Sequence, residues 1–376
     1  MKRSDRILIV SYYYPPYVFG GSLRMHYLRK YLEEKGYSVS VITAQPSDEK
    51  NTTVINDPFP SSSIKKKNPG LRKYNPMPDS MFIWSIRVSL FIRKHHNEFS
   101  SIIISIPPYS ASIFPALMIP AYIRKRIILD VRDTWSGGPL AEYQNSLFEV
   151  MDRFTECFTY SRFHCFTGVT KGIVDNLAAK TGRHIFYIEN PLNRSEAGSG
   201  RVGNHLVYTG KIDMVRFNEE FFSAYSQMSE FPDIVFAGSD NRHMLEQYDF
   251  VKQKGTMNRK KTLSLIEEAG AGLILLGFNQ PRYYEIFPSK LLDYILCRKP
   301  VLYVGPPTIA SEFIENEGIG IAVTSPEREK IIIGIERILE GEFKVSDALI
   351  ESLDYHLVFE KYLRLLDTAS LNSGGP

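Results

Sequence analysis

Short apolar runs alternate with amphipathic helical patterns along the whole chain, and this alternation restricts the fold more than any other feature. The first run, Ile7–Tyr12, is followed by Ser22–Lys35, where apolar residues recur at helical spacing until Gly36. Strands that alternate with helices usually form a parallel sheet covered on both faces. The same pattern continues with apolar runs at Ser38–Thr43, Ser101–Ile106, Arg126–Val131 and Cys165–Val169.

A break in composition separates this series from a second one. Residues 191–204 contain Pro191, a Ser-Glu-Ala-Gly-Ser-Gly run and few apolar side chains, which is typical of a linker. Beyond it, strands are expected at Leu206–Thr209, Ile234–Ala237, Ala271–Leu276, Val301–Val304 and Ile319–Val323, and helices at Arg259–Glu268, Phe287–Cys297 and Glu327–Leu339.

The length of 376 residues fits two domains of ordinary size. We therefore expect an α/β protein with two Rossmann-like, doubly wound parallel-sheet domains, residues 1–190 and 205–345, that face each other across a cleft. Ligands of such sheets bind at the carboxyl ends of the strands, so the cleft is the expected site. Residues 346–376 are expected to hold a last helix, over Ser346–Leu366, and a disordered tail.

The segment Glu285–Asp293 carries a carboxylate at each end, with a proline, a serine, a lysine and two leucines between them. A helix that begins near Pro288 places Glu285 just before its N-terminus and Asp293 more than one turn inside. The two acids then lie at most roughly 12 Å apart, about the length of a sugar diphosphonucleoside from hexose to ribose. The helix N-terminus between them suits a diphosphate. An ordinary amphipathic helix with acids on its exposed face is the alternative interpretation.

Two loops of the first half also carry chemistry. Gly20 and Gly21 follow the first strand and open the first helix, where they let the backbone approach an anion; a plain tight turn is the alternative. The run Asp130–Trp135 ends a later strand. There Asp133 can accept a proton from an acceptor hydroxyl or orient it, and Arg132 can hold Asp133 or a phosphate. The alternative is a buried Arg–Asp pair that orders the loop.

Three loops of the second half follow strands in the same way. Tyr208-Thr-Gly-Lys211 places a cation where a departing diphosphate needs one, although a lysine at a strand end is usually just solvated. Arg216 and Lys290 are further candidates for that charge. Weaker signals come from Gly238, directly after a strand, and from Thr256 in a later loop.

At these motifs the chain resembles the retaining glycosyltransferases of family 4, which have the two-domain GT-B architecture. The family's Glu-x7-Glu motif is Glu-x7-Asp here, and the family's Lys-Pro-Val strand is matched by Lys299-Pro300-Val301. Asp130–Trp135 resembles the Asp-x-Arg-Asp-x-Trp motif of a bacterial subgroup that builds surface polysaccharides, and Pro107-Pro108 is similar to that subgroup's Pro-Pro segment. Gly20-Gly21 resembles the family's double-glycine loop.

The resemblance implies that the second domain binds a nucleotide sugar, UDP- or GDP-linked, and that the first binds a saccharide or lipid-linked acceptor. Catalytic roles fall to Glu285 on the sugar hydroxyls, Asp133 on the acceptor and Lys211 on the leaving diphosphate, while Asp293 meets the ribose. The expected donor contacts are Gly20, Gly21, Gly210, Arg216, Gly238, Thr256, Phe287, Pro288, Ser289, Lys290, Leu291 and Asp293. The expected acceptor contacts are Arg24, Pro107, Arg132 and Trp135. The last helix is expected to cross back onto the first domain.

The resemblance also implies retention of configuration by front-face attack, without a protein nucleophile. Two alternatives stay open: an inverting GT-B transferase or sugar-nucleotide epimerase, and a non-catalytic partner protein that binds a sugar nucleotide. The sequence does not name the donor sugar, its base or the acceptor.

Neither a cofactor nor a metal ion is expected. The sequence has no Asp-x-Asp and no histidine pair at metal-ligand spacing. Its three cysteines, Cys157, Cys165 and Cys297, are too scattered for a disulfide framework or a zinc site. A reducing cytoplasm is therefore the expected compartment.

The net charge is only +3, but its distribution is uneven. Residues 64–97 hold eight Lys or Arg against one acid, Asp79, with aromatic residues between them, and Arg124–Arg126 form a second basic cluster. Such a mixture fits the inner, anionic membrane surface, although a solvated face is the usual outcome. Binding to nucleic acid is not expected, because no recognised motif accompanies the charge. No apolar run is long enough to span a bilayer.

Overall fold

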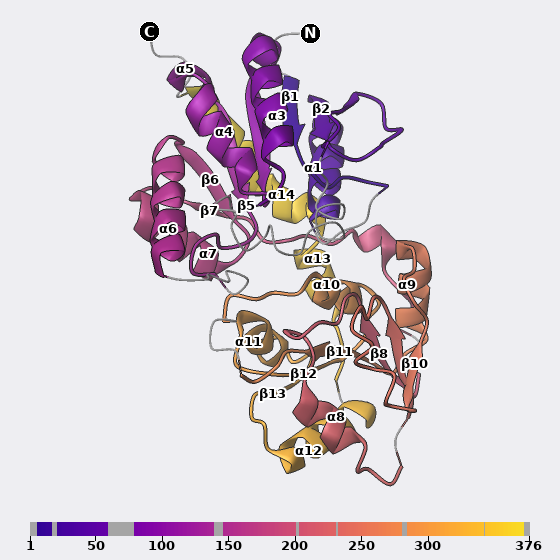
Figure 1. Ribbon diagram of the computed structural model, residues 1–376. Helices are drawn as coiled ribbons and strands as arrows, with labels where there is room; N and C mark the ends of the chain where they lie inside the picture. Colours follow the sequence, from indigo (N-terminus) through magenta and orange to yellow (C-terminus); the bar gives the residue numbers. More distant parts are fainter. Residues whose placement is uncertain are drawn as a thin grey trace. The chain divides into compact units, whose positions relative to one another are not determined.

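The computed structural model describes residues 6–16, 21–58, 79–138, 146–200, 203–230, 232–279, 284–341 and 343–371. The chain divides into two compact units (Figure 1). Unit 1 comprises Met1–Asn190 and Tyr355–Pro376, and unit 2 comprises Pro191–Asp354.

Unit 1 is built on a seven-stranded parallel sheet with the order β3-β2-β1-β4-β5-β6-β7. The direction of winding reverses between β1 and β4, which makes this pair the topological switch point. The inner strands are buried on both faces, as the continuous apolar runs of the sequence predict. The strands are β1 (Arg6–Val10), β2 (Ser38–Thr43), β3 (Thr52–Val54), β4 (Ser101–Ile106), β5 (Ile127–Val131), β6 (Cys165–Gly168) and β7 (Phe186–Tyr187).

Two helix layers cover this sheet, because successive strand residues point to opposite faces. Ile7 and Ile9 pack with α1 (Ser22–Glu34) and α14 (Tyr355–Leu371). Leu8 and Val10 belong to the core on the other face. The helices on that face are α3 (Phe82–His95), α4 (Ser110–Met118), α6 (Ser146–Ser161) and α7 (Lys171–Thr181), joined by η3 (His96–Glu98) and α5 (Ala121–Arg124).

A buried carboxylate attaches α14 to the sheet of unit 1. Asp130, at the end of β5, accepts hydrogen bonds from Arg24 of α1 at 2.9 Å, Thr167 of β6 at 2.6 Å and Tyr362 of α14 at 2.5 Å. Burial opposes ionisation of Asp130, but the adjacent charge of Arg24 holds its pKa below the usual range. Arg24 also donates to the backbone carbonyls of Ile188 and Glu189, so the network fixes the point where the chain leaves unit 1.

Unit 2 contains a six-stranded parallel sheet with the order β10-β9-β8-β11-β12-β13, and its switch point lies between β8 and β11. The strands are β8 (Leu206–Thr209), β9 (Ile234–Ala237), β10 (Val251–Gln253), β11 (Ala271–Leu275), β12 (Val301–Val304) and β13 (Gly320–Val323). One face packs against α9 (Arg259–Glu267), α10 (Ser289–Leu296), α11 (Ile309–Asn316) and α13 (Asp347–Ser352). The other packs against α8 (Glu219–Tyr225) and α12 (Arg328–Leu339).

Both sheets are parallel and are covered by helices on both faces, so the predicted fold class is confirmed. Three short strands, β3, β7 and β10, were not expected. They have two or three residues each, too few for an apolar pattern to show.

The end of the chain differs in detail from the expectation. The stretch Ser346–Leu366 forms two helices, α13 in unit 2 and α14 in unit 1, separated at Leu353 and Asp354. The expected linker is partly structured and groups with unit 2, where Arg194–Glu196 forms a short 3-10 helix, η4. The backbone of Leu192 donates to Leu353, and that of Arg194 to the carboxylate of Asp354. Polar caps and backbone pairing thus order a segment that has few apolar side chains.

Within the described ranges, no helix combines the length and the apolar character needed to cross a bilayer.

Candidate functional site

One tyrosine of α10 bridges the two strands at the switch point of unit 2. Strands β8 and β11 pair only at Leu206 with Ala271 and at Val207 with Gly272. Beyond these pairs the hydroxyl of Tyr294 lies 3.1 Å from the carbonyls of Val207 and Leu273 and accepts the N–H of Thr209 at 3.2 Å. The Tyr294 ring occupies the space beside Gly272, where a Cβ would lie 2.4 Å from it. Helix α10 is therefore fixed at the switch point, which is where doubly wound sheets bind ligands.

The N-terminus of α10 offers backbone donors without a competing side chain. Its N-cap residue, Pro288, is extended, no side chain caps the helix, and the first turn contains no acid. The helix thus begins where the sequence predicts, with Glu285 three residues before Pro288. Ser289 is exposed, whereas the Leu291 side chain is buried in the core. The predicted donor contact of Leu291 is therefore restricted to its main chain.

Three cations gather at the end of β8 beside this helix terminus. The Lys290 ammonium lies 3.3 Å from the ring centroid of Tyr208 and next to Gly210. Lys211 and Arg216 both contact Asp213, at 2.8 and 2.6 Å. Burial, and then the charge of Arg216, lower the pKa of Lys290 well below its usual range. The structure thus brings together the three cations that the sequence proposes, around a carboxylate that it missed.

Two predicted donor-binding glycines have a structural reason to be glycine. Gly210 has a φ of 97°, and its N–H donates to Ala237 at 2.8 Å. A Cβ on Gly238 would lie 1.7 Å from the carbonyl oxygen of Gly210. The ends of β8 and β9 therefore approach closely, which leaves main-chain groups rather than side chains at this edge.

Asp293 lies inside α10 and has a cationic partner. Arg259, at the start of α9, contacts Asp293 at 2.8 Å and Glu196 at 3.1 Å. Burial raises the pKa of Asp293 and the charge of Arg259 opposes the rise. Thr256 is exposed in the loop before α9. Arg259 and Glu196 were not predicted from the sequence, because Arg259 opens an ordinary basic helix and Glu196 lies in the expected linker.

The loop between β11 and α10 contains the remaining predicted donor residues. Glu285 is half-buried there. Phe287 packs edge-on against Phe313 of α11, with 5.3 Å between the ring centroids. This contact ties the loop to the core of unit 2 next to Glu285.

In unit 1, Arg132 joins three segments at the carboxyl edge of the sheet. It donates to the Ser105 hydroxyl at 3.1 Å and to the Pro107 carbonyl at 2.9 Å. Its guanidinium also fills the space beside Gly21 at the start of α1, where a Cβ would lie 1.2 Å from it. Of the predicted set, Gly21, Pro107 and Arg132 therefore lie together; Gly20 lies outside the described residues.

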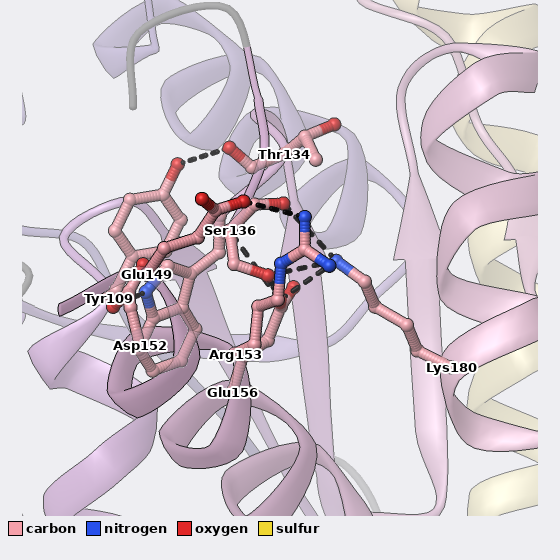
Figure 2. A network of polar contacts seen from close by, with 9 residues as sticks. Tyr109, Thr134, Ser136, Glu149, Asp152, Arg153, Glu156 and Lys180 are labelled. Atoms are coloured by element: carbon pink, nitrogen blue, oxygen red, sulfur yellow. Dashed lines mark hydrogen bonds and ion pairs between the residues drawn. The ribbon is translucent and has the colours of Figure 1, made fainter. Parts of the chain in front are cut away.

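The loop that carries Asp133 is held by α6 and α7 (Figure 2). Glu156 accepts from both the backbone and the hydroxyl of Ser136 and from Lys180 of α7 at 2.8 Å. Trp135 donates to Asp152 at 2.8 Å and stacks on Tyr109. Asp133 itself is exposed, but desolvation by the surrounding protein raises the pKa of its carboxyl and the charge of Arg132 opposes the rise.

Arg24 and Trp135 are both buried. Arg24 is paired with Asp130, and Trp135 fixes the Asp133 loop to α6. Both therefore position neighbouring groups, and their contact with an acceptor stays a prediction.

Two further predictions concern charge. Among the described residues, no group of three or more His, Cys, Asp and Glu is arranged to hold a metal ion. In the basic stretch 64–97, residues 64–78 lie outside the described residues, and most of the rest forms α3.

Comparisons by sequence find no matching family model and no matching curated protein. Comparisons of structure find whole-chain similarity at low identity. HepE from Anabaena, solved in complex with UDP and glucose, is 13% identical with a TM-score of 0.67 over 96% of this chain and 99% of that chain. This chain has the GT-B fold.

Two other GT-B neighbours give the same result. Sucrose-phosphate synthase from Thermosynechococcus elongatus is 13% identical, with a TM-score of 0.64 over 98% of this chain and 97% of that chain. WaaG, a glycosyltransferase involved in lipopolysaccharide biosynthesis, is 13% identical, with a TM-score of 0.62 over 98% and 100%. At such identity the likeness shows the GT-B fold, and the activity has to be argued from the site.

Proposed function

We propose that this chain is a metal-independent, retaining glycosyltransferase of family 4 that transfers a sugar from a nucleoside diphosphate to a saccharide or lipid-linked acceptor. One observation carries the proposal. The uncapped N-terminus of α10 lies with Lys290 at the switch point of unit 2, between Glu285 and Asp293. A diphosphate fits this combination of backbone donors and cations.

The parts of a nucleotide sugar correspond to groups along this segment. The diphosphate is bound by the first turn of α10 and Lys290, with Lys211 and Arg216 adjacent. Glu285 accepts hydrogen bonds from hydroxyls of the transferred sugar, and Asp293, held by Arg259, accepts those of the ribose. The structural neighbour HepE was solved with UDP and glucose, which supports this class of donor.

Unit 1 supplies the acceptor site in this proposal. Asp133 is the exposed acid at the end of β5, and it accepts a hydrogen bond from the acceptor hydroxyl. Arg132 and Gly21 provide cationic and main-chain groups beside it. Because Trp135 and Ser136 are tied to α6, Asp133 keeps its position without a ligand.

At the anomeric carbon the transfer forms one bond and breaks one. The acceptor oxygen bonds to the anomeric carbon on the face from which the diphosphate leaves, and the bond from that carbon to the phosphate oxygen breaks. The acceptor proton passes to the departing phosphate oxygen, so no protein nucleophile is required. Lys290, Lys211 and Arg216 stabilise the charge that grows on the diphosphate.

Calorimetric titration with UDP and GDP, followed by turnover of the sugar nucleotide that binds, tests the proposal. We expect Lys290→Met to weaken binding of the nucleoside diphosphate about 10- to 100-fold, because a charged hydrogen-bond partner is lost. Lys330→Met, on α12, is the matched control, since Lys330 pairs with the exposed Glu327. Equal affinity of wild type and Lys290→Met would refute the diphosphate site.

The role of Glu285 is tested separately. Glu285→Gln should lower turnover about 100-fold or more while nucleotide affinity is retained, because its hydrogen bonds act on the sugar. Glu312→Gln, whose carboxylate accepts from Tyr284, is the control. An NMR assignment of the product anomer decides between retention and inversion, and a changed sugar without transfer would identify an epimerase.

A further inference from the structure

Helix α6 carries its apolar stripe on the side that faces solvent. Leu147, Val150, Met151 and Phe154 follow helical spacing, and each is 45–72% exposed. The buried positions of the same helix are Glu156, Thr159 and Tyr160. A surface helix of a soluble domain normally turns its apolar stripe to the core, so α6 has the opposite arrangement.

Exposed apolar side chains also occur on the neighbouring helices. Leu90 of α3, Leu117 of α4 and Tyr122 of α5 are 50–62% exposed. Helices α3, α4 and α6 lie on the same face of the sheet, and α4 packs against both α3 and α6. We call this surface the outer helix layer. In Figure 1 the helices of this layer lie in front of the sheet of unit 1.

The outer helix layer is basic as well as apolar. Residues 82–95 and 110–125 contain no Asp or Glu, and they supply Arg87, Arg93, Lys94, Arg124 and Lys125. The three acids of α6 are each engaged. Asp152 accepts from Trp135, and Glu156 is buried against Ser136 and Lys180, as Figure 2 shows. Glu149 pairs with Arg153.

We propose that the outer helix layer docks onto an anionic lipid bilayer, with the stripe of α6 inserted at the headgroup level. An exposed apolar stripe flanked by cations fits such a surface. The charge argues against a second copy of this chain, because two basic surfaces would face each other. The surface shares α3 with the stretch 64–97, where membrane contact was expected from the sequence, and adds α4, α5 and the apolar stripe of α6.

The docking surface adjoins the loop of Asp133. Trp135 and Ser136, directly after Asp133, contact Asp152 and Glu156 on the inward side of the same helix. Docking through α6 thus brings a lipid-linked acceptor to the same helix that holds the Asp133 loop. This link rests on the proposed function, but the docking itself does not.

One cysteine provides a direct probe of docking. Cys157 is exposed on α6, one turn beyond Phe154. Burial raises the pKa values of Cys165 and Cys297 to about 12, so a thiol reagent at neutral pH labels Cys157 selectively. With an environment-sensitive dye on Cys157, we expect a blue shift and increased emission upon addition of vesicles that contain phosphatidylglycerol. Pure phosphatidylcholine vesicles should have little effect, and added salt should weaken the response.

Co-sedimentation of the unlabelled full chain with the same vesicles tests the stripe. Val150→Ser/Phe154→Ser should reduce partitioning at least tenfold, and Arg93→Gln/Lys94→Gln should reduce it several-fold. Ile333→Ser and Lys330→Gln, at exposed positions of α12 in unit 2, are the controls and should bind as wild type. All variants should retain nucleotide affinity, which shows that they are folded and separates this test from that of the proposed function.

Three outcomes would overturn the proposal. The first is that, at low salt, the wild-type chain does not co-sediment with anionic vesicles and the emission of the dye on Cys157 does not change. Another is undiminished partitioning of both double variants. The last is a dimer in sedimentation equilibrium that Val150→Ser/Phe154→Ser dissociates, which would make the stripe a protein interface.

Discussion

Arg259, the first residue of α9, forms an ion pair with Asp293 in the middle of α10. The distance between Nη1 of the guanidinium and Oδ1 of the carboxylate is 2.8 Å. The same guanidinium contacts Glu196 at 3.1 Å. Burial raises the pKa of Asp293, Arg259 lowers it and Glu196 raises it. The ionisation of Asp293, and with it the proposed ribose contact, therefore depends on Arg259.

We predict that Arg259→Met shifts the pH dependence of nucleotide binding. Without the guanidinium the pKa of Asp293 rises, so the carboxylate is protonated at higher pH and accepts fewer hydrogen bonds. When the pH is lowered, the affinity of Arg259→Met for the nucleoside diphosphate should therefore begin to fall at a higher pH than that of the wild type. Calorimetric titration between pH 5 and pH 8 measures this. Glu196→Gln should shift the dependence in the opposite direction; equal shifts of both variants would contradict the role of Arg259.

The lowered pKa of Lys290 predicts how stability changes with pH. Between that lowered pKa and the ordinary value of 10.5, Lys290 is more protonated in the unfolded chain than in the folded one. The free energy of unfolding therefore increases as the pH rises through this interval. Lys290→Met should be more stable than wild type at pH 6, and the advantage should shrink toward pH 9. Urea denaturation of the free protein measures the difference. A constant difference across this range would show that the pKa is not lowered.

Loss of the Tyr294 hydroxyl should destabilise unit 2. In Tyr294→Phe the N–H of Thr209 and two strand carbonyls lose a partner in a buried site, which costs about 1–3 kcal/mol. Tyr303→Phe is the matched control, since its hydroxyl contacts the carbonyl of Pro306 in a loop. Chemical denaturation should show the larger loss for Tyr294→Phe, and nucleotide affinity should fall with it because α10 loses its anchor.

Substitution of Asp130, which is buried with Arg24, should destabilise the protein more than substitution of an exposed acid. Asp130→Asn leaves the Arg24 charge without a counter-ion and should lower the free energy of unfolding by about 3–5 kcal/mol. The pKa of Asp130 is lower in the folded chain than its value near 3.9 in the unfolded chain. The carboxylate therefore contributes its full stabilisation above pH 3.9, and this stabilisation is lost as the pH falls through the folded-state pKa. The loss should therefore be the same at pH 5 and pH 7. Asp175→Asn, exposed on α7, should have little effect.

The sequence was sufficient to predict the fold because each inner strand is a continuous apolar run. Ser38–Thr43, Ser101–Ile106 and Leu206–Thr209 were expected at the bounds that the structure has. The edge strands β3 and β10 are three residues long and partly exposed, so their residues resemble a loop. Helix α10 could be placed because a proline fixes its first turn.

The sequence indicates which charged residues lie at strand ends, but it does not indicate which residues pair with them. Cations and acids at strand ends can be read from the sequence, since strand ends of a parallel sheet meet at one edge. Their internal partners cannot, because Glu196, Arg259 and Asp293 come from three separate segments. The same limit explains Arg24, whose carboxylate partner is 106 residues away. The outward stripe of α6 could not be foreseen either, since periodicity does not tell which side of a helix faces the core.

The attachment of Tyr362 to Asp130 has a consequence for synthesis of the protein. Unit 2 is one uninterrupted stretch, whereas unit 1 lacks α14 until the ribosome has translated all of unit 2. During elongation unit 2 can become compact first, while unit 1 awaits the helix that covers α1, pairs Lys361 with Glu189 and shields the buried charge of Asp130. A nascent polypeptide that stalls near residue 354 would therefore leave that half incompletely packed and open to proteases.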